Sequence, residues 1–403
     1  MQMETNLGPV TVRERSKILD VWRGFALLGI AMANFPEFSL WTFMSPSKQA
    51  ALPWSGADDV VHYLLYMLVD GKFYTLFSLL FGIGFSIILS RRGWRLFVRR
   101  MTILFVIGFC HRIFLWSGDI LLLYAVAGLL LTLFIPLSDR WLFRSAILLL
   151  LLPIGFDAIQ ECFNMDWSAF FYNAWWQKAY ERGITEENFA TWLVDAKTYD
   201  KVFDFLIQGT YERTWELVSG FRLFKVLGLF ILGYLFGKHR LYTRLAELPL
   251  RRIMISTLSL SLPLSALYAW SAVGGHPWGN TVHSILYTFS VYPTAIGYAC
   301  GLALLFLSNS ERKCWDALAA PGRMALTCYI LQTIIGRVHF YGIGFGLGAS
   351  LPLAAVEVIA IAAFILEILV TLLWLRFFRF GPLEWIWRML TYGKHFPLLK
   401  QKE

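Results

Sequence analysis

The sequence predicts an all-α fold, a polytopic membrane helix bundle of about ten transmembrane helices. Of its 403 residues 57% are hydrophobic and only 16% are charged, whereas a soluble domain carries about 25% charged residues. The mean hydropathy is +0.57, and the apolar residues form continuous runs long enough to cross a bilayer. Transmembrane strands would instead alternate in runs of about ten residues. The composition therefore excludes a disordered chain and an ordinary soluble enzyme.

The ten apolar runs differ in regularity. The second is interrupted by Asp70, Gly71 and Lys72, and the ninth ends in the glycine-rich stretch 342–348. The first follows a polar segment and has no small-residue cleavage site behind it, so we expect a retained span and not a signal peptide. The five cysteines form no CxxC pair, and neither a disulfide framework nor a metal site is expected. In chain order the runs are 18–36, 60–89, 97–115, 119–136, 143–161, 222–238, 252–272, 281–307, 324–346 and 352–375.

The basic residues predict the orientation of the spans. With the N-terminus inside, the inner segments hold 24 Lys and Arg residues, whereas the four short outer connections hold only Lys48, Arg112 and Arg337. Such a bias places both termini in the cytoplasm (N-in/C-in), and an even number of spans is then required. The net charge of +9 follows from this pattern, so it does not indicate a nucleic-acid partner.

The predicted topology divides the chain into five parts. The connection 162–221 is long and acidic, with nine acids and five bases. Its aromatic start, from Trp167 to Trp176, predicts an interfacial helix on the outer leaflet; the alternative is a small soluble cap with its own core. The parts are a cytoplasmic segment (1–17), a five-span half (18–161), this extracytoplasmic loop (162–221), a second five-span half (222–375) and a cytoplasmic tail (376–403).

Three stretches of the chain resemble a known family. The first is Arg15-Ser-Lys-Ile-Leu-Asp-Val-Trp-Arg-Gly-Phe-Ala-Leu-Leu-Gly-Ile, running on to Asn34; the others run from Phe77 to Tyr124 and from Gly322 to Gln332, with the closing segment 381–392. Together they are similar to the YeiB family of bacterial membrane proteins, whose C-terminal half is domain of unknown function 418. The resemblance implies a multi-pass protein of the bacterial inner (plasma) membrane. One departure is Cys328, where the family usually has Asn.

A weaker likeness joins the first span to transmembrane acyltransferases. Leu19-Asp20-x-x-Arg23-Gly24, followed by a polar residue at position 34, is similar to the acyltransferase-3 and heparan N-acetyltransferase proteins. Acyltransferase-3 proteins have His at the position of Asn34, whereas the heparan-acetylating branch has Asn there, as this chain does. This likeness implies acyl transfer from a cytoplasmic donor of the acyl-CoA type to an outer small-molecule, lipid or glycan acceptor. The donor would be a substrate, and no permanently bound cofactor is expected.

Charged residues inside the spans are the candidate substrate-binding groups, because each costs a few kcal/mol there. Asp20 and Arg23 are one turn apart; they either form a local ion pair that anchors the span or place Arg23 against an anionic donor group. Asp70 and Lys72 flank Gly71, which permits a helix break, and a broken helix at membrane depth must line protein or water. We expect these two residues in a cavity wall, with Lys72 joining Arg23 at the donor.

His111 and Asp119 are the sharpest catalytic candidates. Only seven residues separate them, so the ends of spans three and four must be neighbours. Asp119 can then hold the His111 imidazole in one tautomer and leave its other nitrogen free as a general base for the acceptor. Asn34 would donate its amide hydrogens to the developing oxyanion. The alternative is a structural polar clasp at a helical hairpin, with Arg112 pairing Asp119.

The sequence also leaves two other functions open. A transporter or exporter of a small amphiphile would use acids along its path, and Asp70, Glu357 and Glu367 could supply them. A non-catalytic membrane scaffold would need none of these groups. An acyltransferase makes a covalent product, whereas a transporter moves its compound unchanged.

Overall fold

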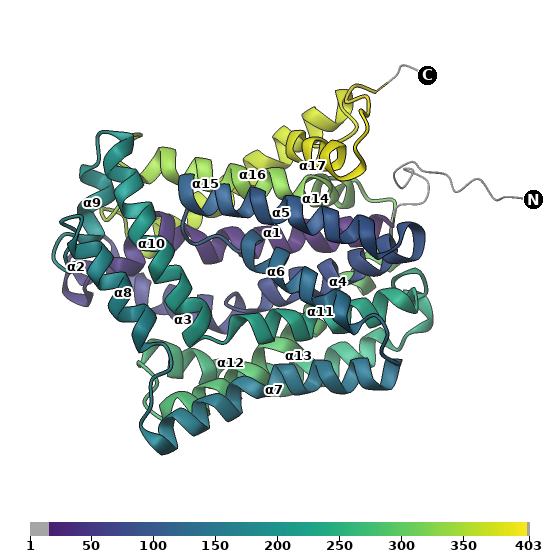
Figure 1. Ribbon diagram of the computed structural model, residues 1–403, viewed down its shortest axis with the longest axis horizontal. Coiled ribbons are helices and arrows are strands. Elements are labelled where there is room, and N and C mark those ends of the chain that lie inside the picture. Colours follow the sequence, from purple (N-terminus) through teal and green to yellow (C-terminus); the bar gives the residue numbers. More distant parts are fainter. Residues whose placement is uncertain (1–15, 401–403) are drawn as a thin grey trace, which may run out of the picture.

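The computed structural model describes residues 16–400. The regular secondary structure in this part of the chain is helical, apart from one isolated β-bridge between Phe378 and Leu399. Most helices lie side by side along one direction (Figure 1). They are α1 (Lys17–Phe38), α2 (Pro46–Ala50), α3 (Asp58–Leu68), α4 (Lys72–Arg92), α5 (Trp94–Phe114), α6 (Leu121–Leu131), α7 (Asp139–Phe163), α8 (Ala169–Tyr180), α9 (Phe189–Asp195), α10 (Tyr199–Ser219), α11 (Arg222–Lys238), α12 (Leu250–Val273), α13 (Gly279–Ser308), α14 (Lys313–Arg323), α15 (Ala325–Phe340), α16 (Leu353–Phe377) and α17 (Pro382–Tyr392).

Six helical stretches in the described part of the chain are long and apolar enough to cross a membrane, or up to eight if each of two bent pairs counts as one span. The pairs are α10 with α11, bent by 64°, and α14 with α15, bent by 80°. All of them except α1 carry exposed large apolar side chains, for example Leu148, Leu260 and Val358, which are 59%, 64% and 66% exposed. An apolar surface of this extent is that of a membrane protein.

The two ends of the bundle differ, and we name them by what lies there. At the arginine end α1 begins, and α14 and α17 lie beside it; at the cap end the bundle is covered by α8, α9 and α10 (Figure 1). Residues 1–15 of the predicted N-terminal segment and residues 401–403 of the predicted tail lie outside the described residues.

Close backbone packing ties α1 to α14 at the arginine end. A Cβ atom on Gly24 would lie 1.8 Å from the carbonyl oxygen of Leu318, and one on Gly322 would lie 1.9 Å from that of Asp20. Only glycine allows two helices to approach this closely. The motif residue Gly24 thus has a structural purpose, since it fixes the helix that carries Arg23.

The second apolar run is broken where the sequence interrupts it. Helix α3 ends at Leu68 and α4 begins at Lys72. Between them Gly71 has a φ of 74°, in the left-handed region that favours glycine. The break exposes Asp70 to the interior of the bundle, where its carboxylate accepts a hydrogen bond of 2.5 Å from the Tyr268 hydroxyl.

The long connection 162–221 forms three helices, α8, α9 and α10. Trp175 of α8, Phe189 of α9 and Phe205 of α10 are buried against one another, and the Trp175 indole donates to Gln208 Oε1 at 2.5 Å. These buried residues belong to the same apolar cluster as the core of the bundle. Helix α10 supplies apolar residues to this cluster as well as charges that make the loop acidic. The interfacial position of the aromatic start on the outer leaflet stays a prediction.

Candidate functional site

A large cavity of about 1210 Å³ runs inside the bundle. Its wall includes Arg23 near the start of α1 and Glu37 near the end of the same helix. Fourteen residues at 1.5 Å each separate them, so the cavity extends about 21 Å along α1. That distance is about two thirds of the hydrocarbon thickness of a bilayer, and it joins the arginine end to the cap end.

The wall at the arginine end is strongly cationic. Arg100 of α5 lies over the Trp387 ring of α17, with its guanidinium carbon 3.5 Å from the ring centroid, and it is repelled by Arg23 and Arg388. Arg23 also donates to Asp20 at 2.9 Å. The arginines that line this end are Arg23, Arg100, Arg323, Arg379 and Arg388.

One carboxylate, Glu384 of α17, lines the same region in the described residues. It accepts hydrogen bonds from the backbone N–H groups of Leu326 and Thr327, at 2.8 and 3.0 Å, and from the Thr327 hydroxyl at 2.6 Å. Glu384 therefore caps the first turn of α15. Its negative charge is committed to that helix, so the arginine end keeps a positive field suited to an anionic ligand.

The middle of the cavity is aromatic and apolar. Phe81 of α4 stacks on Phe230 of α11 with their ring centroids 4.5 Å apart, and Phe85 and Leu104 complete this part of the wall. The hydroxyl of Tyr124 hydrogen-bonds with that of Ser78 at 2.7 Å. This stretch suits a chain or an acyl group better than an ion.

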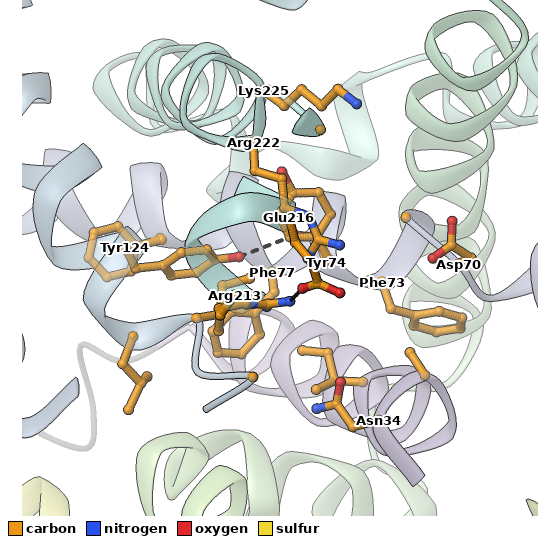
Figure 2. Close-up of a pocket in the computed structure, with 18 of the residues that line it drawn as sticks. Asn34, Asp70, Phe73, Tyr74, Phe77, Tyr124, Arg213, Glu216, Arg222 and Lys225 are labelled. Carbon is orange, nitrogen blue, oxygen red and sulfur yellow. Dashed lines mark hydrogen bonds and ion pairs between the residues drawn. The ribbon is translucent and has the colours of Figure 1, made fainter. Parts of the chain in front are cut away.

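The wall at the cap end carries charges of both signs. Figure 2 shows Asn34, Tyr74, Arg213, Glu216 and Arg222 around one space, with Arg213 reaching Glu216. The Arg213 guanidinium donates to the Glu216 carboxylate at 2.6 Å.

Glu37 lies one turn beyond Asn34 on α1 and accepts a hydrogen bond of 3.1 Å from the Trp116 indole. The charges of Glu216, Arg213 and Arg222 act on it. A carboxylate and an amide therefore share one face of α1 inside this space.

The cavity contains some of the residues singled out in the sequence and not others. Arg23, Asn34 and Asp70 line it. Asp20 lies behind Arg23, as its hydrogen-bond partner. Lys72 is fully buried outside the lining, and its ammonium donates to the Tyr66 carbonyl at 2.6 Å.

Lys72 is also far from Arg23. Arg23 packs near Gly84, which follows Lys72 by twelve residues, or about 18 Å, along α4. The structure thus does not bring these two cations together, because α1 and α4 are aligned so that their charged residues fall at different depths.

His111 and Asp119 are direct neighbours, with Nδ1 and Oδ1 2.8 Å apart. The other ring nitrogen, Nε2, lies 3.1 Å from the Thr333 hydroxyl of α15, and Asp119 Oδ2 accepts from the Leu122 N–H at 2.8 Å. Both side chains are buried and neither lines the cavity. Arg112 does not pair with Asp119; it donates to the Thr210 carbonyl and the Thr214 hydroxyl.

The two acids of α16 lie apart from the cavity. Glu357 is 6% exposed and has no hydrogen-bond partner for either oxygen in the described residues. Glu367 is fully buried and accepts from Gln332 at 3.0 Å. Neither lines the cavity that Asp70 lines, so the structure does not join the three acids into one path.

Sequence reasoning missed Glu37, Arg213 and the arginines beside Arg23. Glu37 follows Asn34 by three residues, and that helical spacing was a signal in the sequence. Arg100 contributed to the sequence argument only as one of the basic residues that predict the orientation of the spans. Arg213 lies in the long loop, and nothing in the order of residues indicated that α10 would return it to the end of α1.

The fold and its large cavity define a helical membrane protein whose cavity has a cationic end and an end of mixed charge. Comparison with known proteins then gives the family. The chain is 31% identical over 395 residues to the uncharacterized protein YeiB of Escherichia coli K12, covering 94% of this chain and 96% of that protein. The chain belongs to the YeiB family.

Other comparisons agree with this membership. Residues 236–394 match the family model described as a protein of unknown function, DUF418. The uncharacterized protein YxaH of Bacillus subtilis is 28% identical over 98% of this chain and 99% of its own length. An uncharacterized 39.9 kDa protein of Bacillus acidopullulyticus is 29% identical, with the same coverage. No solved structure matches this chain.

Proposed function

We propose that the chain crosses the bacterial inner membrane ten times with both termini in the cytoplasm. Each predicted apolar run corresponds to a helix, or to helices joined at a break. The bias of 24 inner to three outer basic residues supports a cytoplasmic arginine end. Reporter fusions after residues 95, 245 and 395 should report the cytoplasm, and fusions near 48, 190 and 276 the outer side. A cytoplasmic signal at residue 190 would overturn this topology.

We further propose that the protein is an acyltransferase, moving an acyl group from a cytoplasmic donor to an outer or membrane acceptor. The observation that carries the proposal is that the large cavity joins a cluster of arginines to an amide and a carboxylate across an apolar middle. The likeness of the first span to transmembrane acyltransferases adds to it. An acyl-CoA-type donor carries phosphates for the arginines and an acyl arm for the apolar stretch.

The donor site in this proposal is the arginine end. Arg100 and Arg23 act on the donor phosphates, because guanidinium groups pair with phosphate oxygens in a bidentate geometry. The Trp387 ring holds Arg100 from the other side. Among the predicted donor residues, Arg23 keeps this role, Asp20 orients it, and Lys72 supports the wall at the α3–α4 break.

The transfer step in this proposal takes place beside Asn34 and Glu37. An acceptor hydroxyl or amine attacks the acyl carbonyl, and its proton passes to the Glu37 carboxylate. Asn34 donates its amide hydrogens to the oxyanion. The new C–O or C–N bond then replaces the bond from the carbonyl carbon to the donor sulfur, and the proton passes on to the leaving thiolate.

His111 and Asp119 are positioning residues in this proposal. Both imidazole nitrogens have partners within the protein, so neither is free to take a proton from an acceptor. The pair connects α5, α6 and α15, and the wall residues Trp116 and Gly118 lie between the two candidates in sequence.

The proposal is tested with purified protein in proteoliposomes, given radiolabelled acyl-CoA and membrane extract from cells lacking the protein. Acyl transfer predicts label in an acceptor fraction and equimolar release of free thiol. Arg100→Gln should lower the rate of acyl transfer and Arg99→Gln should not, because Arg99 lies outside the cavity lining.

A transporter is the second candidate, because the cavity reaches both ends of the bundle. It predicts movement of an unchanged amphiphile across the proteoliposome membrane with no thiol release. That result would replace the enzyme proposal.

A further inference from the structure

A second cavity, of about 770 Å³, lies at the arginine end. It is formed where α1 begins, where α4, α11 and α13 end, and by residues 240–246 after α11. It shares no lining residue with the large cavity. Whatever occupies it is therefore bound separately from the proposed acyl donor.

The charged residues lining this second cavity are all basic. They are Lys17, Arg91, Lys238 and Arg240, and no Asp or Glu lines it in the part of the chain that is described. Lys17 and Lys238 are paired behind the wall, with Asp316 at 2.9 Å and Asp139 at 2.6 Å. Arg240 is exposed and has no carboxylate partner within residues 16–400. Arg240 thus gives the cavity a positive charge that no carboxylate within residues 16–400 neutralises.

Two tyrosines add neutral hydrogen-bond donors to these cations. Tyr234 of α11 is 5% exposed, with its ring packed on Phe85 at 5.0 Å between centroids. Its hydroxyl and that of Tyr242 line the cavity without a hydrogen bond to any described residue. By contrast, the Ser86, Ser90 and Thr243 hydroxyls donate to backbone carbonyls. Guanidinium, ammonium and phenol groups together are the donors that phosphate oxygens accept.

The remaining wall is apolar and continues onto the membrane-facing surface. Ile87 and Leu89 of α4 and Phe306 and Leu307 of α13 line it. Leu307 is 43% exposed, and Leu305 on the same helix is 62% exposed. A ligand here meets cations on one side and a lipid-exposed surface on the other. This favours an amphiphile over a free ion.

We propose that the second cavity binds the phosphate of an anionic membrane lipid at the cytoplasmic surface, with the acyl chains lying along the end of α13. Basic pockets between transmembrane helices on the cytoplasmic side bind phosphate headgroups in this way. A free phosphate ester has the same headgroup chemistry, so the experiment separates the two sources.

Native mass spectrometry of the purified full chain tests the proposal. The probes are phosphatidylglycerol, phosphatidylcholine as a lipid without net charge, and glycerol phosphate as the headgroup without chains. Phosphatidylglycerol should bind in preference to phosphatidylcholine. Arg240→Gln should lower its affinity about fivefold. The double variant with Lys17→Gln should lower it further, by at most about 25-fold in total, because Lys17 is already paired with Asp316. Tyr234→Phe should give a smaller loss.

Arg244→Gln is the matched control. Arg244 belongs to the same loop and is also exposed, but it pairs with Glu247 and does not line the cavity. It should leave lipid binding unchanged. An equal loss in Arg244→Gln, or no preference for phosphatidylglycerol, would overturn the site. Glycerol phosphate binding as tightly as the lipid would overturn the lipid source and assign the cavity to a soluble phosphate ester. No part of this experiment depends on acyl transfer, so a failure of the lipid-site proposal is distinct from a failure of the proposed enzyme activity.

Discussion

The two ends of the large cavity handle charge in opposite ways. At the arginine end five arginines line the wall beside one carboxylate, and that carboxylate caps α15. At the cap end acids outnumber Arg and Lys, and the two signs are mixed: the acids are Glu37, Asp70, Asp157, Glu161, Asp166 and Glu216, and the bases are Arg213, Arg222 and Lys225. The first end is suited to hold an anion, whereas the second is suited to orient groups and exchange protons.

The largest expected effect is at the cap end. Glu37→Gln keeps the side-chain shape but cannot take a proton, so we expect turnover to fall by about 10² to 10⁴ with the donor KM nearly unchanged. Steady-state acyl transfer in proteoliposomes measures both constants. Turnover within a few fold of the parent protein would remove Glu37 from the transfer step and place the base elsewhere.

Substitutions in the wall between the two ends should lower the stability of the protein and leave the transfer step unchanged. His111→Ala leaves the Asp119 carboxylate buried without its partner, which costs about 3 kcal/mol. We expect a lower thermal midpoint and yield, with activity per folded molecule largely kept. Asp119→Asn should behave alike, and Thr333→Val, which removes the Nε2 contact and a hydrogen bond to the Tyr329 carbonyl, should cost about 1 kcal/mol. Folded but inactive His111→Ala would restore the general-base hypothesis.

At the arginine end the expected effect is on binding. Arg100→Gln should raise the donor KM about 10- to 100-fold, because charge-assisted hydrogen bonds contribute about 1.5–3 kcal/mol, while turnover at saturation stays nearly constant. Titrating the donor against Arg100→Gln and Arg99→Gln separates a local effect from a loss of general surface charge. If both variants shift KM equally, the cluster is not the donor site.

The smallest expected effect concerns the carboxylate that the arginine end commits to α15. Glu384→Gln weakens the cap on Leu326 and Thr327, and we expect a loss of about 1 kcal/mol in stability. It also removes a negative charge near the arginines, so donor affinity should rise slightly. Thermal unfolding measures the stability and donor titration measures the affinity. A substitution of the exposed Glu311, Glu311→Gln, is the control. A fall in donor affinity would mean that Glu384 itself contacts the donor.

Much of the fold could be predicted because hydrophobicity and helix breaks are local properties. The apolar runs coincide with helices, and the break at Gly71 follows from one residue and its charged neighbours. The neighbourhood of His111 and Asp119 follows from a short hairpin. Their burial could not be foreseen, because it depends on Thr333, which is 222 residues away from His111.

The site itself required contacts between distant segments. Arg100 and Trp387 are 287 residues apart in sequence, and Arg213 returns from the cap to a space that begins on α1 (Figure 2). Each of these side chains looks ordinary in its own segment. From the sequence alone, Arg100 is one of the basic residues that predict the orientation of the spans, and Arg213 is part of a solvated loop. Only the packing of the helices places both around one cavity.

The cap on α15 has a consequence for biosynthesis. Thr327 precedes Glu384 by 57 residues, so the ribosome completes α14, the 80° bend and all of α15 well before it adds the carboxylate that satisfies the first turn of α15. Until translation reaches α17, those N–H groups must be held by water or by the translocation machinery. A chain that ends before Glu384 would contain α15 and still lack this contact, so α15 acquires its full cap only after α17 is made.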